Sequence, residues 1–210
     1  MKALKELLSE LTFTCERGNL EKEITAVVYD SRKIVEGCLF VCIKGANFDG
    51  HQAAAEAAEK KAAAIIVSQE VVELPKQSET TLIRVEDTRY ALAFVSAAWF
   101  DHPAKKLTTI GITGTKGKTT TTYLVKSILE NAGRKVGLVG TIEIIIGDTH
   151  IHAVNTTPES YLLQEYFAKM VESGCDTVVM EVSSQALMLH RTQGFVFDFG
   201  IFTNLEPDHI

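Results

Sequence analysis

The chain has 210 residues, of which 46% are hydrophobic and 23% charged, as expected for a folded globular protein of one or two domains. This composition excludes a disordered tail and a low-complexity polymer, and no apolar run reaches the roughly 20 residues of a membrane-spanning helix. The net charge of −6 argues against a broad basic surface for nucleic acid, although a local device can still bind phosphate. We therefore expect a cytoplasmic protein with neither a nucleic-acid nor a membrane partner.

The first hundred residues alternate between short strand-like and helical segments. β-Branched and aromatic residues indicate the strands, and Ala, Glu and Lys indicate the first helix. Strands are expected at 24–31, 38–45, 64–68 and 81–87, and helices at 51–64 and 88–100. Pro103 disfavours helical geometry at the residue before it, so we place a domain boundary between residues 103 and 104.

The second half has more apolar strands separated by helices. We expect strands at 108–113, 136–141, 177–184 and 197–205, a β-hairpin over 142–154 that turns at Gly147, and helices at 118–131 and 157–173. Strands that alternate with helices and are apolar on both faces favour a largely parallel sheet. The predicted fold class is therefore α/β, with a small N-terminal α/β domain at 1–103 and the first part of a P-loop-type parallel-sheet domain at 104–210.

Two details of these helices are also predicted. Pro158 suits the first turn of the helix over 157–173. The helix over 118–131 should turn one apolar stripe toward the sheet, with charged residues outside it. This stripe consists of Leu124, Val125, Ile128 and Leu129.

A glycine-rich loop lies between the strand at 108–113 and the helix at 118–131. Gly114 and Gly117 permit positive φ, which lets successive backbone N–H groups turn toward one anion, and the positive end of the helix dipole lies at the same point. Lys118 can reach phosphate oxygens, and Thr119 can offer its hydroxyl to Mg²⁺. The pattern is G-x-x-G-K-T, a short form of the P-loop, because Ile112 stands where the general pattern has Gly. Its context favours a nucleotide-binding loop over a turn with an exposed lysine.

At this loop the chain resembles a known family. Residues 113–121 (TGTKGKTTT) are similar to the ATP loop of the Mur ligases, the amino-acid-adding enzymes of peptidoglycan synthesis. Residues 30–32 (DSR) and 49–53 (DGHQA) resemble the UDP-binding domain of the ligases that add the third residue. Residues 155–158 (NTTP), 180–184 (MEVSS) and 203–209 (TNLEPDH) resemble their central ATPase domain. The NTTP and HQA elements favour these ligases over the dipeptide-adding ligase and over folylpolyglutamate synthase.

The resemblance implies an ATP-dependent ligation that uses Mg²⁺. ATP would phosphorylate the D-glutamate side chain of UDP-N-acetylmuramoyl-L-alanyl-D-glutamate, and the amine of L-lysine or meso-diaminopimelate would attack the acyl phosphate. The implied catalytic residues are Lys118, Glu181 and His209, and the implied magnesium ligands are Thr119, Glu181 and His209. ATP would be bound by Gly114, Thr115, Lys116, Gly117, Lys118, Thr119 and Thr120. The muramoyl substrate would be bound by Ser31, His51, Gln52, Ala53, Asn155, Thr156, Thr157, Ser183 and Arg191.

Plainer interpretations exist for several of these residues. Ser31 and Asn155 belong to types that build turns without any ligand, and Glu181 could be a solvated carboxylate at a strand end. The motif context favours binding in each case. Lys116 replaces the Asn that is usual in this loop, so we expect an added positive charge beside the phosphates. Leu189 stands where many relatives carry Gln, and no substrate contact is assigned to it.

The resemblance also implies parts of the ligase that would follow Ile210. These are a carbamylated lysine and a C-terminal domain that binds the incoming amino acid and closes over the site. Without closure an acyl phosphate is open to water, so the 210-residue chain alone should not ligate, and the full enzyme is expected to be a monomer. Two alternatives stay open: a short protein that binds ATP or a UDP-muramoyl-peptide without catalysis, and another Mur-type ligase. The strand at 197–205 should leave an apolar sheet edge uncovered, which favours aggregation or a partner.

Overall fold

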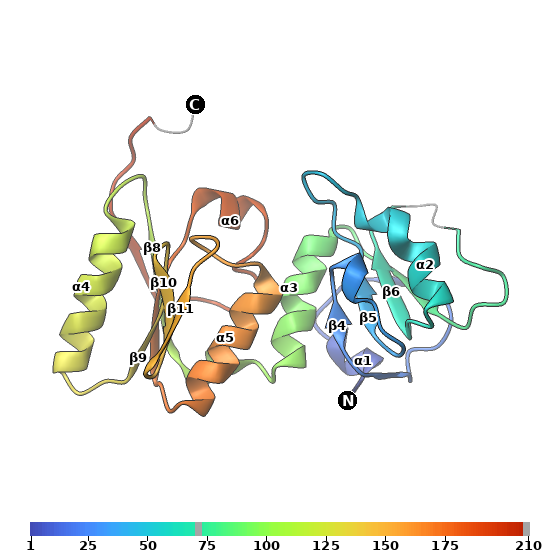
Figure 1. Cartoon of the computed structure of the whole chain (residues 1–210), viewed down its shortest axis with the longest axis horizontal. Helices are drawn as coiled ribbons and strands as arrows, with labels where there is room; N and C mark the ends of the chain where they lie inside the picture. Colours follow the sequence, from blue (N-terminus) through green and yellow to red (C-terminus); the bar gives the residue numbers. More distant parts are fainter. Residues whose placement is uncertain (70–72, 208–210) are drawn as a thin grey trace. The chain divides into compact units, whose positions relative to one another are not determined.

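The computed structural model describes residues 1–69 and 73–207. The chain forms two compact units, unit 1 over Met1–Trp99 and unit 2 over Phe100–Ile210 (Figure 1). Unit 1 ends at Trp99, whereas the expected domain boundary lies between residues 103 and 104, and each unit is described by itself. No helix within the described residues is both long and apolar enough to cross a membrane.

Unit 1 is built on a five-stranded sheet. The strand order is β2-β7-β6-β5-β4, in which β4 to β7 run parallel and β2 pairs antiparallel with β7 at one edge. The strands are β2 (Thr14–Arg17), β4 (Val27–Val28), β5 (Leu39–Val41), β6 (Ala64–Val67) and β7 (Thr81–Arg84). A separate antiparallel pair is formed by β1 (Lys2–Ala3) and β3 (Glu23–Ile24).

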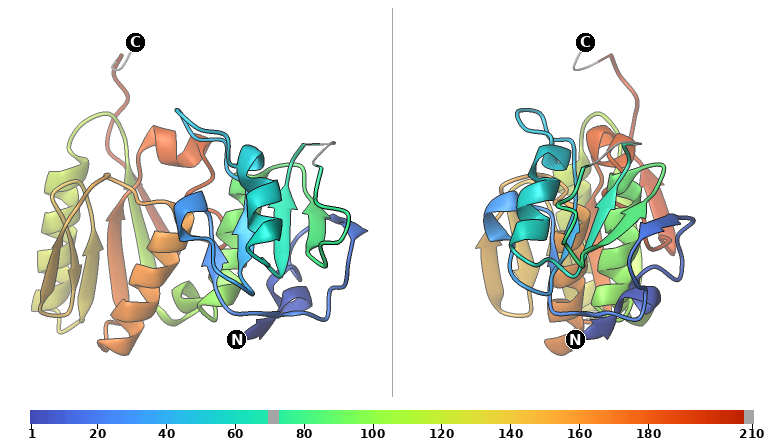
Figure 2. Two further views of the ribbon diagram at one scale, coloured as in Figure 1. Left: turned by 45° about the vertical axis from the view of Figure 1, so that its right-hand side comes forward. Right: turned by 90° about the vertical axis from the view of Figure 1, so that its right-hand side faces the viewer.

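Helices cover both faces of this sheet. They are α1 (Leu4–Leu7), α2 (Ala54–Glu59) and α3 (Thr88–Trp99), with 3₁₀ turns η1 (Ser31–Lys33) and η2 (Gly50–Ala53). The small alanine side chains of α2 let it pack closely against Phe40, Ile65 and Val67. Helix α3 lies on the opposite face (Figure 2) and packs against β4 and α1.

Two predicted elements of unit 1 are shorter than expected because Asp side chains begin 3₁₀ turns. The strand expected at 24–31 is divided into β3 and β4, and η1 follows where Asp30 accepts a hydrogen bond from the Arg32 N–H. The helix expected at 51–64 begins as η2, which Asp49 caps through the His51 N–H, and its α-helical part ends at Glu59. Lys61 then takes a positive φ of 58°, which no helix can continue.

Unit 2 contains a six-stranded sheet in the order β11-β10-β9-β12-β8-β13. Strands β9, β12, β8 and β13 are parallel, as predicted, whereas β10 and β11 form the expected antiparallel hairpin, with Gly147 at φ 55° in its turn. The strands are β8 (Thr108–Thr113), β9 (Val136–Val139), β10 (Glu143–Ile146), β11 (Thr149–His152), β12 (Thr177–Glu181) and β13 (Phe199–Phe202).

Helices α4 (Lys118–Asn131) and α5 (Ser160–Glu172) lie on opposite faces of this sheet (Figure 1). Leu163 and Phe167 of α5 pack against Val178 and other residues of one face. Val125 and Leu129 of α4 pack against the other face. Two shorter elements complete the unit, η3 (Pro103–Lys106) and α6 (Ser184–Met188).

Three expectations about unit 2 are corrected. Leu124 and Ile128 are 59% and 66% exposed, because only the Val125–Leu129 side of α4 reaches the sheet. Helix α5 begins at Ser160, after Pro158, with Glu159 as its N-cap. The strand expected to continue to residue 184 ends at Glu181, and α6, which the sequence analysis missed, follows at once.

Candidate functional site

Two adjacent interior strands of unit 2 bring the glycine-rich loop and Glu181 to the same edge of the sheet. Strands β8 and β12 are parallel neighbours in which Ile112 pairs with Glu181, so the loop that follows β8 and the last residue of β12 emerge together. Such carboxyl ends are where open α/β sheets bind ligands. They border a pocket of about 340 Å³, which is lined by Thr115, Gly117, Lys118, Thr119, Thr120, Thr141, Thr156 and Glu181.

The first turn of α4 supplies positive charge and N–H donors to this pocket. Gly117 precedes the helix at φ 83° and no side chain caps it, so the N–H groups of the first turn have no partner within the helix. The Lys118 ammonium donates to the carbonyl oxygens of Gly114 at 2.6 Å and Thr115 at 3.1 Å. The lysine thus lies over its own loop, and the helix dipole favours an anion at the same point.

Thr115 and Lys116, which precede Gly117 in the loop, contact the segment that follows β13. The backbone N–H of Thr115 donates to the Asn204 carbonyl, and that of Lys116 donates to the Asn204 side-chain oxygen, both at 3.0 Å. The Lys116 ammonium lies 2.6 Å from a Glu206 carboxylate oxygen. The expected added charge of Lys116 is therefore balanced by a carboxylate, and the anion-binding N–H groups are confined to the start of α4.

Glu181 is 1% exposed and its carboxylate is surrounded by hydroxyl and N–H donors. Oε2 accepts from the Thr119 hydroxyl at 2.9 Å and the Thr141 hydroxyl at 3.1 Å, and Oε1 accepts from the Thr141 N–H at 2.8 Å. Gly140 leaves room for this arrangement, because a Cβ there would lie 2.6 Å from Oε1. The sequence analysis missed Thr141, although its position just beyond strand β9, which neighbours β12, is a usable signal.

The oxygen atoms gathered here fit a magnesium ion. The Thr119 hydroxyl and a Glu181 carboxylate oxygen are already within hydrogen-bond distance, and hydroxyl and carboxylate oxygens are ligands that Mg²⁺ prefers. Within the described ranges no three His, Cys, Asp or Glu side chains gather in a group that could hold a metal. His209, the other ligand implied by the resemblance, lies outside the described residues.

The segment at 155–158 approaches Glu181 from the other side. The Thr156 hydroxyl lies within hydrogen-bond distance of the Thr141 hydroxyl, at 3.0 Å, and lines the pocket, whereas Asn155 is exposed. Thr157 is buried; its hydroxyl donates to the Glu181 carbonyl at 2.9 Å and accepts from the Ser183 N–H at 3.1 Å. In this structure the Thr157 side chain therefore joins two segments of the unit.

Ser183 and Arg191 also have partners within unit 2. The Ser183 hydroxyl oxygen accepts from the Ala186 N–H at 3.2 Å and caps α6. The Arg191 guanidinium donates to the Thr157 carbonyl at 3.1 Å, and its Nε lies 3.7 Å from a Glu159 carboxylate oxygen. These bonds place the guanidinium beside the 155–158 segment, where it could meet an anionic ligand.

In unit 1 the candidate residues lie in the two 3₁₀ turns. Ser31 begins η1 beside Asp30, whose carboxylate forms a paired contact with the Arg32 guanidinium at 2.9 and 2.8 Å. This hydrogen bonding holds the pKa of Asp30 at about 2. The same Asp30 carboxylate accepts from the Arg32 N–H and so caps the turn.

His51 and Ala53, two of the residues implied for the UDP end of the substrate, are buried. His51 Nδ1 lies 2.6 Å from an Asp49 oxygen, and Nε2 accepts from the Ser68 N–H at 3.0 Å, which assigns the proton to Nδ1. Ala53 belongs to the hydrophobic core under α2. Of the three predicted residues in η2, only Gln52 is exposed, because the inner side of the turn sits on the sheet.

Beside the pocket of unit 2, a second polar cluster connects α4 to the hairpin. Tyr123 donates to Glu143 at 2.7 Å, and His150 Nδ1 lies 2.7 Å from the other Glu143 oxygen. Burial, together with the hydrogen bond to Glu143, raises the pKa of Tyr123 to about 12. Sequence reasoning missed this cluster because Tyr123 belongs to α4, and its contact with the hairpin depends on how the helix packs on the sheet.

The fold of unit 2 and its glycine-rich loop define a P-loop-type nucleotide-binding α/β protein. Residues 23–99 match the Mur ligase family catalytic domain, and residues 112–210 match the Mur ligase middle domain. The chain belongs to the Mur ligase family, as its resemblance implied.

Curated relatives and solved structures agree with this assignment. UDP-N-acetylmuramoyl-L-alanyl-D-glutamate–2,6-diaminopimelate ligase of Clostridium perfringens is 48% identical over 99% of this chain, and that of Bacillus licheniformis is 47% identical over 92%. The chain spans 42% and 38% of these two relatives. A solved structure of a ligase of the same name has the same fold, with a TM-score of 0.80 and 22% identity over all of this chain and 41% of that one.

A more distant structural neighbour contains a nucleotide. It is the MurF ligase from Thermotoga maritima in complex with ADP. The match has a TM-score of 0.55 and 25% identity, and it covers 85% of this chain and 37% of the MurF chain.

Proposed function

We propose that this chain is part of an ATP-dependent ligase that joins diaminopimelate to UDP-N-acetylmuramoyl-L-alanyl-D-glutamate through an acyl phosphate. The observation that carries the proposal is the pocket in which Lys118, Thr119 and Glu181 converge at the end of a parallel sheet. The names of the curated relatives favour diaminopimelate over lysine as the added residue. A cytoplasmic location and a monomeric full enzyme stay predictions.

The residues of the pocket suit phosphoryl transfer, which depends mainly on positioning and on stabilising negative charge. The Lys118 ammonium donates hydrogen bonds to two loop carbonyls. When ATP is bound, it would donate instead to oxygens of the β- and γ-phosphates. The N–H groups at the start of α4 would bind the same phosphates. Thr119 and Glu181 would hold Mg²⁺, which neutralises charge on the phosphoryl group when it is bound.

The muramoyl-peptide would be held by the remaining candidates. Arg191 offers a planar guanidinium suited to a carboxylate or phosphate, and Asn155 and Thr156 present polar groups near Glu181. Ser31, His51, Gln52 and Ala53 are the candidates of unit 1 for the UDP end, and of these the side chains of His51 and Ala53 are buried.

Titration of ATP with Mg²⁺ into the chain tests the nucleotide site. Replacing Lys118 by Ala should weaken binding at least about tenfold, because a charge-assisted contact to phosphate is lost. Lys126→Ala is the matched control, since this lysine of the same helix pairs with Glu130. Equal affinity of the parent and the Lys118→Ala variant, measured by calorimetry on folded samples, would remove the proposal.

A second experiment tests the reaction. The chain is incubated with ATP, Mg²⁺, the UDP-muramoyl-dipeptide and either diaminopimelate or lysine, and products are separated by chromatography. We expect no tripeptide product from the 210 residues alone, and faster product formation with diaminopimelate than with lysine from the full-length protein. Preference of the full-length protein for lysine would contradict the proposed substrate.

A further inference from the structure

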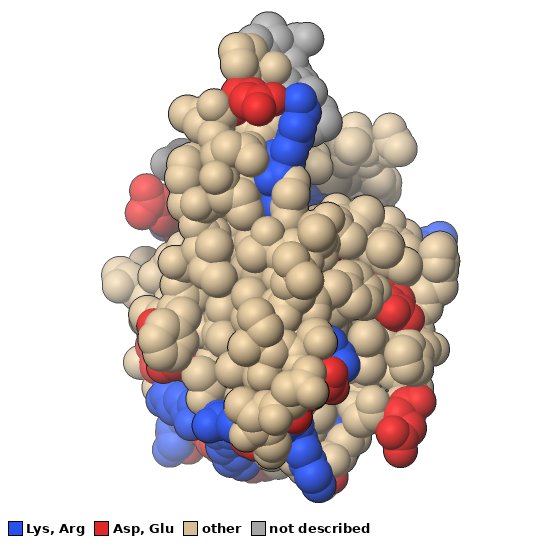
Figure 3. Space-filling view, turned by 90° about the vertical axis from the view of Figure 1, so that its left-hand side faces the viewer, with Lys and Arg blue, Asp and Glu red and all other residues tan. Residues whose placement is uncertain are grey.

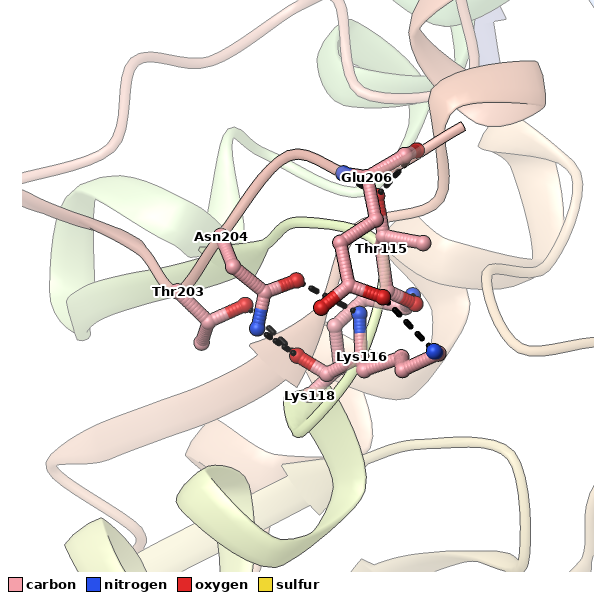
Figure 4. A network of polar contacts seen from close by, with 6 residues as sticks. All are labelled: Thr115, Lys116, Lys118, Thr203, Asn204 and Glu206. Atoms are coloured by element: carbon pink, nitrogen blue, oxygen red, sulfur yellow. Dashed lines mark hydrogen bonds and ion pairs between the residues drawn. The ribbon is translucent and has the colours of Figure 1, made fainter. Parts of the chain in front are cut away.

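Residues 203–206, which follow β13, form a continuous set of hydrogen bonds to the glycine-rich loop (Figure 4). The Asn204 side chain forms hydrogen bonds with both backbone polar groups of Lys116. Its oxygen accepts from the Lys116 N–H at 3.0 Å, and its amide donates to the Lys116 carbonyl at 3.1 Å. The Thr203 hydroxyl donates to the same carbonyl at 2.7 Å. The backbone of Lys116 is thus held at both of its polar groups.

The neighbouring residues extend this contact. The Asn204 carbonyl accepts from the Thr115 N–H at 3.0 Å, and the Glu206 N–H donates to the Thr115 hydroxyl at 3.0 Å. Gly114 is needed for the close approach, because a Cβ there would overlap the Thr203 hydroxyl. The two segments are separated by nearly ninety residues in sequence, so the loop geometry is imposed from outside the loop.

We propose that Asn204 is a positioning residue for nucleotide binding. A short loop with two glycines has many accessible conformations. By fixing the peptide groups on both sides of Lys116, Asn204 selects the one in which Gly117 can begin α4 and Lys118 lies in the pocket. This inference rests on the proposed function, since it assigns Asn204 to the ATP site without direct contact with ATP.

The Lys116–Glu206 ion pair has a smaller part in this arrangement. Both side chains are at least half exposed, and exposed ion pairs contribute little. Glu206→Gln removes the pair and keeps the backbone contacts of residue 206, so it is the matched control for Asn204→Ala. It should leave ATP affinity within about threefold of the parent chain.

Calorimetric titration of ATP with Mg²⁺ compares the parent chain with Asn204→Ala, Asn204→Asp and Glu206→Gln. Both Asn204 variants should bind ATP at least about tenfold more weakly, because each loses a bond to a Lys116 backbone group. Circular dichroism melting selects folded samples. Parent-like affinity in both Asn204 variants would overturn the inference.

A double-mutant cycle separates positioning from general damage to the fold. If Asn204 acts by placing Lys118, then Asn204→Ala should cost much less affinity when Lys118 is already Ala. Additive losses would overturn the inference, because a merely destabilised unit weakens binding in either background.

Amide hydrogen exchange tests the same contact without nucleotide. The Lys116 amide, which donates to the Asn204 side chain, should be protected in the parent chain and should exchange faster in Asn204→Ala, with little change in Glu206→Gln. Absence of ATP binding by the parent chain would refute the proposed function. Unchanged exchange at the Lys116 amide in Asn204→Ala would refute the inference about Asn204.

Discussion

The Glu181 carboxylate is held by donors from two other segments of unit 2. Thr119 comes from the first turn of α4, and Thr141 follows strand β9. Sequence reasoning predicted Glu181 and Thr119 because each belongs to a motif with a chemical role. It missed Thr141 and Asn204, because their contacts depend on which strands are neighbours in the folded sheet.

A substitution at Gly140 tests how tightly the Glu181 carboxylate is packed. Gly140→Ala would place a Cβ 2.6 Å from a Glu181 oxygen, and the expected cost in free energy of unfolding is about 1–3 kcal/mol. Gly200→Ala is the control, because a Cβ there meets nothing within 4 Å. Denaturant unfolding measures both, and an equally small effect in both variants would contradict the tight packing around Glu181.

Tyr123 predicts a specific alkaline transition. Its pKa is raised to about 12 by burial and by its bond to Glu143, so the folded chain holds this proton more tightly than the unfolded chain does. The stabilisation is therefore complete below about pH 10 and is lost as the pH rises toward 12. Subtracting the ultraviolet titration of Tyr123→Phe from that of the parent should isolate a step near pH 12; a step near pH 10 would contradict the structure.

At the scale of elements, local signals predicted α4 better than the segments around Glu181. The helix expected at 118–131 has those bounds in the structure, because a glycine precedes it and Gly133 at φ 85° follows it. The sequence predicts one strand over 177–184, but Ser183 caps α6 there. The apolar run indicates a strand, and the two serines after it indicate the start of a helix. The Ser183 cap decides where the strand gives way to α6.

The two sides of α4 differ in what they stabilise. Leu129 packs against the sheet, whereas Leu124 is mostly exposed. Leu129→Ala should lower the free energy of unfolding by about 1–3 kcal/mol, and Leu124→Ala by less than about 0.5 kcal/mol. Thermal or urea unfolding of the two variants checks this prediction, and a larger loss for Leu124→Ala would contradict the orientation of α4.

At the scale of the whole molecule, the sequence predicted the α/β class, because apolar strands alternate with helices over both units. It could not predict the strand orders, which depend on pairing between distant segments. The α4 side of unit 2 shows a broad area without charged side chains (Figure 3). Exposed Leu124 and Ile128 belong to α4, and Phe199 and Phe202 belong to the edge strand β13.

This edge predicts self-association of the chain. Phe199 and Phe202 are 60% and 63% exposed on β13, which pairs with β8 alone among the described strands, and such edges pair with other chains. Light scattering should show association that grows with protein concentration. Phe199→Lys should reduce it, and Phe48→Lys, which changes an exposed aromatic outside the strands, should not. A parent chain that stays monomeric at high concentration would contradict this expectation.

The register between β8 and β12 determines how the candidate site responds when unit 2 begins to unfold. Five consecutive residue pairs, from Thr177–Thr108 to Glu181–Ile112, join these two strands, each of which has a strand on both sides. The spacing between loop and carboxylate is therefore built into the most protected part of unit 2, whose amides should exchange only through global opening. Heating or mild denaturant should fray the hairpin and β13 first and leave this spacing intact until the unit melts as a whole.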